Sequence, residues 1–157
     1  MRQPLLIAAL VCAIASPAAA LAADLKLSGM LNATNVVSAT ESPATGEVRA
    51  MLQDDNDLRI DLIYSGLEET ATGAALHVGP SSENGALVER MDLDEDDSGD
   101  SGRVVGAQLD VSDEIGARIR AGEAYVVITT TQHPAGVIRA QLVPQAVRLP
   151  AAPLVDE

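Results

Sequence analysis

Histidine is the first residue type in this sequence that could do chemistry, and the chain has two, His77 and His133. Because residues two apart in a β-strand point to the same side, a His-x-His pair can direct two imidazoles at one metal ion. Ala75 stands where the partner of His77 would be. A metal site needs three or four ligands, so the pattern favours a lone histidine that hydrogen-bonds the loop after its strand. His77 as a metal ligand is the alternative.

The acidic segment 92–100, with the sequence DLDEDDSGD, is a second candidate. Its alternate Asp residues resemble the start of a calcium-binding loop. However, the sixth position is Asp97, where that loop requires Gly, and the twelfth is Arg103, where a bidentate Glu belongs. The segment is therefore not an EF-hand. Runs of like charge usually stay hydrated, so we expect a solvated acidic loop, with a weak cation site as the alternative.

Arg139 is the third candidate, and it lies in an apolar segment that follows Pro134 and Gly136. From a strand behind such a turn, a guanidinium can donate several hydrogen bonds to loop carbonyls or to an acidic side chain. We therefore expect Arg139 to hold a sheet edge to a neighbouring loop. Binding of an anion is the alternative, but the formal net charge of −13 creates a field that repels anions.

The composition disfavours two broad classes of function. The single cysteine, Cys12, lies in the N-terminal segment, and no Gly-x-Ser-x-Gly motif is present, so nucleophilic catalysis has no obvious residue and we expect neither an enzyme nor a cofactor. Nucleic-acid binding needs clustered basic residues and aromatic platforms. The chain has 10 basic against 23 acidic side chains, two Tyr, and no Phe or Trp.

Residues 1–22 have the pattern of an export signal. Arg2 supplies the positive charge, residues 5–15 form the apolar stretch, and small residues mark cleavage near Ala20 or Ala22. The apolar stretch stops at Ser16, well short of the roughly 20 residues that a membrane-spanning helix needs. We therefore expect a secreted or periplasmic product without membrane insertion.

The rest of the chain shows the period-two alternation of half-buried strands. The residues after 22 suffice for one core without disulfides, so we expect one domain, 23–144, followed by a flexible Pro- and Ala-rich tail, 145–157. Ser112 can cap a short helix over 113–121, which Gly122 would end. The predicted strands cover 25–29, 48–52, 58–64, 74–78, 86–92, 104–111, 125–131 and 137–142.

Five segments resemble, in the same order, the CHRD domain, a module named for its repeats in chordin. The closing hairpin from Tyr125 to Leu142 has the order Tyr-Val, a Thr, Pro-x-Gly and Ile-Arg-x-Gln-Leu. The other matches are LSGMLNA at 27–33, TG at 45–46, the strand with Tyr-x-Gly-Leu at 58–67, and AALHVGP at 74–80. The resemblance spans about residues 25–144. The family has His at positions 75, 77 and 129, of which this chain keeps one.

The resemblance and the strand pattern together predict an all-β fold: an antiparallel Greek-key β-sandwich, immunoglobulin-like or barrel-like, with one short helix. We expect an exported, non-catalytic module that binds a protein partner or an extracellular matrix component, or that is structural. The alternative is an exported metal-binding or redox-related protein that uses His77. The residues expected to form the family's structural motif are Gly79, Pro80, Tyr125, Gly136, Arg139 and Gln141.

Overall fold

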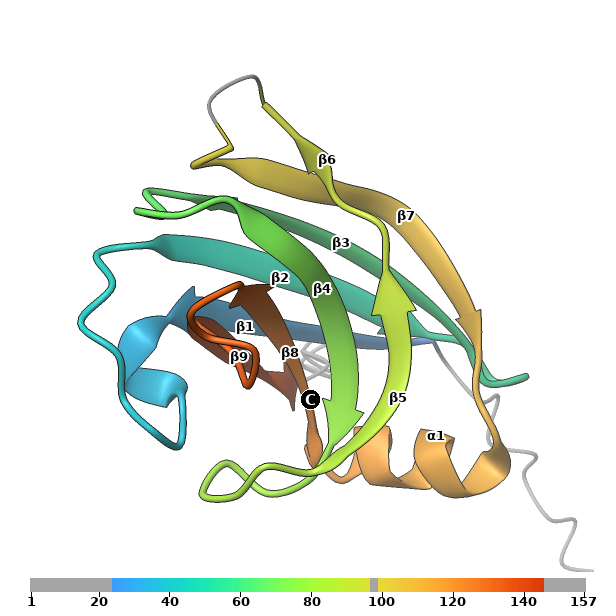
Figure 1. Ribbon diagram of the computed structural model, residues 1–157. Helices are drawn as coiled ribbons and strands as arrows, with labels where there is room; N and C mark the ends of the chain where they lie inside the picture. The colour runs from blue at the N-terminus through green and yellow to red at the C-terminus, as the bar shows by residue number, and fades with distance from the viewer. Residues whose placement is uncertain (1–23, 97–98, 146–157) are drawn as a thin grey trace, which may run out of the picture.

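The computed structural model describes residues 24–96 and 99–145, and Figure 1 shows them as strands around one short helix. The expected signal segment, and the expected tail except for its first residue, lie outside this range. The elements are β1 (Leu25–Asn32), the 3-10 turn η1 (Ala33–Asn35), β2 (Thr45–Leu52), β3 (Asp57–Ser65), β4 (Ala71–Val78), β5 (Ala86–Met91), β6 (Asp94–Glu95), β7 (Gly102–Asp110), α1 (Asp113–Arg120), β8 (Ala124–Thr130) and β9 (Ile138–Pro144).

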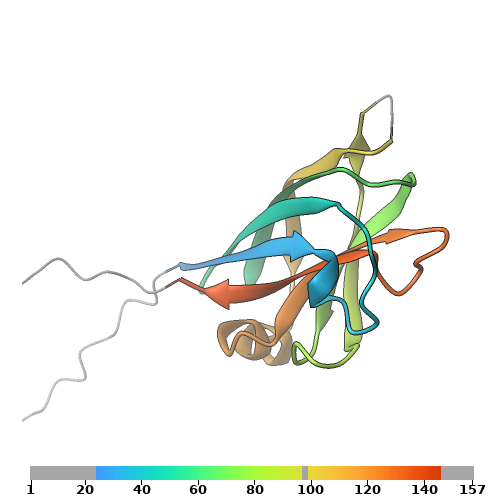
Figure 2. The same ribbon diagram turned by 90° about the vertical axis from the view of Figure 1, so that its left-hand side faces the viewer.

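All nine strands form one antiparallel sheet in the order β5-β4-β8-β9-β1-β2-β3-β7-β6. The sheet curls until β5 comes into contact with β7. Figures 1 and 2 show the resulting barrel-like form, with α1 at one end. The predicted all-β antiparallel fold with one short helix is confirmed, in its barrel-like form.

Alternation along each strand gives the barrel its apolar interior. On β3, Leu58, Ile60, Leu62 and Tyr64 are buried, while the residues between them are more exposed. Each buried side chain of that size is stabilised by about 1.5 to 3 kcal/mol relative to exposure to water. Residues from the other long strands join the same core, so burial closes the sheet without a disulfide.

Helix α1 closes one end of the barrel, and its ends follow from local chemistry. The side chain of Ser112 accepts a hydrogen bond from the backbone N–H of Ile115, which caps the N-terminus as predicted. Gly122 ends the helix with φ at +78°, a conformation that glycine adopts without strain. Ile119 is fully buried, so the helix is fixed by its apolar face.

The sequence patterns missed the short strand β6, which lies inside the acidic segment. Asp94 pairs with Arg103 of β7 in the ladder, and Arg103 Nη2 lies 3.0 Å from Asp94 Oδ2. Arg103 offsets the repulsion between the acidic side chains of the segment. That repulsion was the reason to expect a solvated loop. Residues 94 and 95 of the segment therefore form the outer strand of the sheet.

Candidate functional site

Arg139 is a buried cation that holds the loop between β4 and β5. Its side chain is 1% exposed, although it lies on β9 in a short, acidic protein. Nη1 donates to the carbonyl of Glu83 at 2.9 Å, and Nη2 donates to the carbonyl of Pro80 at 2.8 Å. Nη2 also donates to Gln141 Oε1 at 3.2 Å. These bonds are the loop attachment that the sequence suggested for Arg139.

Tyr125 lies between Arg139 and His77. The guanidinium carbon of Arg139 is 3.4 Å from the centroid of the Tyr125 ring, a cation–π contact. On the other flanking strand, the His77 ring stacks on Tyr125 with a centroid distance of 5.2 Å and an interplanar angle of 13°. The Tyr125 hydroxyl accepts a hydrogen bond from the N–H of Gly85 at 2.7 Å. His77 Nδ1 lies 3.2 Å from the carbonyl oxygen of Gly85.

Gln141 completes this arrangement, which we call the loop clamp: His77, Tyr125, Arg139 and Gln141. Gln141 Nε2 donates to the carbonyls of Gly79 at 3.2 Å and Gly122 at 2.9 Å. The clamp therefore binds both ends of the 79–85 loop and the turn after α1.

Gly136, in the turn before β9, adopts φ of +123°, where glycine is favoured. The expected motif residues Gly79, Pro80, Tyr125, Arg139 and Gln141 thus meet at one place, and Gly136 shapes the turn that leads to it.

Burial lowers the pKa of the Arg139 guanidinium, and the neighbouring Tyr125 opposes that shift. The ordinary pKa of arginine is so far above neutrality that the group stays charged. A buried charge needs partners, and the clamp gives Arg139 carbonyl oxygens and a ring face. This use of the side chain is architectural.

Ala75, His77 and Thr129, the positions at which the sequence resemblance suggested histidines, all line one cavity of about 270 Å³. The three positions therefore share one cavity, and His77 is the one histidine among them. Among residues 24–96 and 99–145, no group of three or more His, Cys, Asp and Glu side chains could hold a metal ion.

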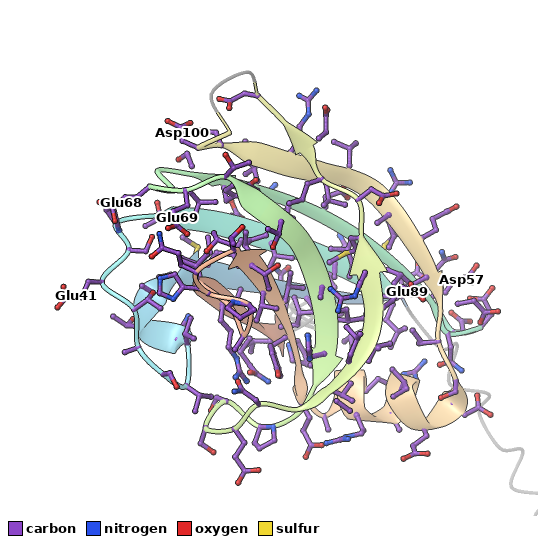
Figure 3. All side chains as sticks on the ribbon, in the orientation of Figure 1. Glu41, Asp57, Glu68, Glu69, Glu89 and Asp100 are labelled. Atoms are coloured by element: carbon purple, nitrogen blue, oxygen red, sulfur yellow. The ribbon has the colours of Figure 1, made fainter. Side chains whose placement is uncertain are left out.

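His133 lines a different hollow, of about 450 Å³. Glu41, Glu68 and Glu69 line it, and Figure 3 shows these three carboxylates on the same side of the molecule. His77 and His133 are therefore not brought together into one site.

A groove of about 590 Å³, which the sequence did not predict, lies on the outer face of the sheet. Met30 of β1 and Ile63 of β3 line it, and they are 62% and 61% exposed. Both lie in register with Glu47 of β2. The signal was visible in the sequence, because Met30 and Ile63 are apolar at positions where the alternation predicts polar residues. We call this surface the outer groove. The other residues that line it are Thr45, Gly46, Glu47, Tyr64, Ser65, Asp94, Asp96, Ser101, Gly102 and Arg103.

Comparison with known proteins gives one match, to the family model of the CHRD domain, over residues 27–142. No curated protein and no solved structure matches the chain. No helix within the described ranges is long and apolar enough to cross a membrane. The matched range begins in β1, ends in β9, and contains every residue of the loop clamp. Because the family model matches well over half of the sequence, this chain belongs to the CHRD domain family.

Proposed function

We propose that this chain is an exported, non-catalytic module that binds a protein partner through the outer groove. The observation that carries the proposal is the exposure of Met30 and Ile63 on one sheet face, on either side of Glu47. Exposed apolar residues gathered in a hollow mark contact sites, and here two exposed apolar side chains share one groove with charged and polar ones.

The charges around the groove define the chemistry of the partner. Glu47 lies between Met30 and Ile63, Asp94 and Asp96 also line the groove, and the chain carries a formal net charge of −13. Arg103 is the one basic residue in the lining, and it is paired with Asp94. The complementary partner therefore presents an apolar anchor for Met30 and Ile63, surrounded by Lys or Arg side chains. Electrostatic attraction of this kind speeds association, and it is sensitive to salt.

Export supports the same proposal. The N-terminal pattern of residues 1–22 is that of a signal, and the remaining chain has no cysteine, so its stability does not depend on the redox state of its compartment. A barrel stabilised by burial and a fixed loop is a rigid platform for a contact surface on its outer face.

The test is capture with a matched pair of variants. Protein purified from cells that express the full chain is immobilised and exposed to the periplasmic and secreted fractions of cells that make it natively. The native protein and Val105→Asp should retain a common partner, because Val105 is 71% exposed but does not line the groove. Ile63→Asp should lose it, because the charge replaces the apolar anchor.

A salt series separates specific capture from adhesion. Raising the salt concentration from about 0.1 M to about 1 M shortens the Debye length from about 10 Å to about 3 Å. Binding of a partner with basic side chains should therefore weaken. Equal retention of that partner by the native protein and Ile63→Asp would show that the groove is not the contact surface.

A further inference from the structure

A small apolar cluster lies apart from the main core, on the outer face of β4 and β8. It consists of Ala75, Tyr125 and Val127, which are 4%, 2% and 3% exposed. These residues belong to the floor of the 270 Å³ cavity described above. Leu87 of β5 and the turn residues Pro134 and Ala135 line its sides. The cavity is thus an apolar hollow that solvent can reach from outside the barrel.

Arg90 gives this cavity a cation. Among the described residues, its guanidinium has no hydrogen-bond or ion-pair partner, whereas the arginines at positions 49, 59, 103 and 118 each pair with a carboxylate. The backbone N–H of Arg90 bonds to the side chain of Glu89, which alternates to the other side of the strand. No Asp or Glu lines the cavity. Arg90 is the only arginine or lysine among the described residues that line the cavity, and it also lines a neighbouring hollow with Glu89, Asp92 and Asp94.

Three further polar side chains line the cavity: His77, Asn84 and Thr129. Small-molecule sites combine a mostly apolar lining with a few convergent polar groups of this kind. The volume lies below the range of about 300 to 1,000 Å³ that is usual for drug-sized ligands, so the cavity suits a single ring or a short chain.

We propose that this cavity binds a small carboxylate with a flat apolar body. The carboxylate pairs with the guanidinium of Arg90, whose two parallel donors match the two oxygens of the acid. The apolar body lies on Ala75 and Val127, beside the stacked rings of His77 and Tyr125. This ligand site is separate from the outer groove, because the two share no lining residue.

The experiment is a titration of the purified protein with benzoate, followed by NMR of the two tyrosine rings. Tyr125 lines the cavity and Tyr64 lines the outer groove, so Tyr64 serves as an internal control. Benzoate should shift the Tyr125 signals saturably and leave those of Tyr64 unchanged. Benzamide has the same ring without the charge, and it should bind about tenfold more weakly because it loses the charge-assisted contact.

Two substitutions complete the test. Arg90→Gln, at an exposed position of β5, should weaken benzoate binding about tenfold. Arg49→Gln, at an exposed position on β2, should leave it unchanged. Equal binding of benzoate and benzamide, or equal binding by the native protein and Arg90→Gln, would overturn the carboxylate assignment. The absence of a saturable Tyr125 shift would overturn the site itself.

Discussion

Arg139 and Tyr125 are in direct contact, with the guanidinium carbon 3.4 Å from the ring centroid, and they bond to different residues of the same loop. Arg139 donates to the carbonyls of Pro80 and Glu83, and Tyr125 accepts from the N–H of Gly85. The loop between β4 and β5 is therefore fixed by two side chains that also fix each other. Removal of either one should affect the whole loop.

Arg139→Ala should lower the free energy of unfolding by about 1 to 3 kcal/mol, because it leaves buried carbonyl oxygens without donors. Arg139→Lys is the matched control, since lysine keeps the charge but cannot reproduce the planar arrangement of donors. We expect an intermediate loss for the lysine variant. Chemical denaturation measures both. An unchanged midpoint for Arg139→Ala would mean that the bonds to Pro80 and Glu83 do not contribute to stability.

Tyr125→Phe separates the two roles of the tyrosine. It keeps the ring under Arg139 but removes the hydroxyl that bonds Gly85, so it should cost about 1 kcal/mol. Tyr125→Leu removes the ring as well and should cost more, because cation–π contacts contribute up to about 2 kcal/mol when desolvated. Amide hydrogen exchange at Gly85 should increase in both variants. Equal stability of the Phe and Leu variants would argue against a contribution from the stacked rings.

Ala75→His combined with Thr129→His should create a three-imidazole metal site, because both positions line the cavity that contains His77. Three imidazoles and a water are a ligand set that zinc accepts. Isothermal titration after treatment with a chelator should show zinc binding by the double variant and only weak binding by the native protein. Adding His77→Ala to the double variant should abolish the gain.

Tight one-to-one zinc binding by the native protein would contradict this expectation and favour a metal-dependent function. A folded double variant with no gain in affinity would show that the three side chains do not converge.

The exported protein should begin near residue 21 or 23, because small residues at Ala18, Ala20 and Ala22 follow the apolar stretch. N-terminal sequencing of protein recovered from outside the cytoplasm measures the cleavage point. A product that starts at Met1 and stays with the membranes would refute the export prediction.

Most strands could be predicted because apolar and polar residues alternate regularly along them. This alternation arises because only one face of the sheet packs against the core. The exceptions have local causes. Strand β7 contains a bulge near Gly106, whose backbone N–H bonds to Asp61 Oδ1 at 2.7 Å and whose φ is +61°. A bulge inserts one extra residue into one of two paired strands. Its position depends on how the two strands pair, so the alternation of apolar and polar residues along one strand does not predict it. The sequence did not predict strand β6 because its residues are acidic. Arg103 on the next strand pairs with Asp94 and so stabilises this acidic strand in the sheet.

The sequence predicted the role of Arg139 in the loop clamp but not the hydrogen-bond partners of its side chain. The sequence marked Arg139 as a residue that holds a loop, since a lone arginine in an apolar strand needs partners. It did not identify the carbonyls of Pro80 and Glu83, because those lie more than 50 residues away and their position depends on the curl of the sheet. The outer groove was missed for a different reason. Within its own strand, each of Met30 and Ile63 is a single exposed apolar residue. The two form one surface only because β1 and β3 lie on either side of β2.

The most direct test of the proposed function is site-specific photo-crosslinking in living cells that make the protein natively. A photoreactive residue is placed at position 63 in the outer groove, and in a second strain at position 105, which is exposed but outside it. We predict one predominant crosslinked protein at position 63, with a basic contact surface, and none at position 105. Identical crosslinks at both positions, or none at position 63, would contradict the claim that this groove binds a protein partner.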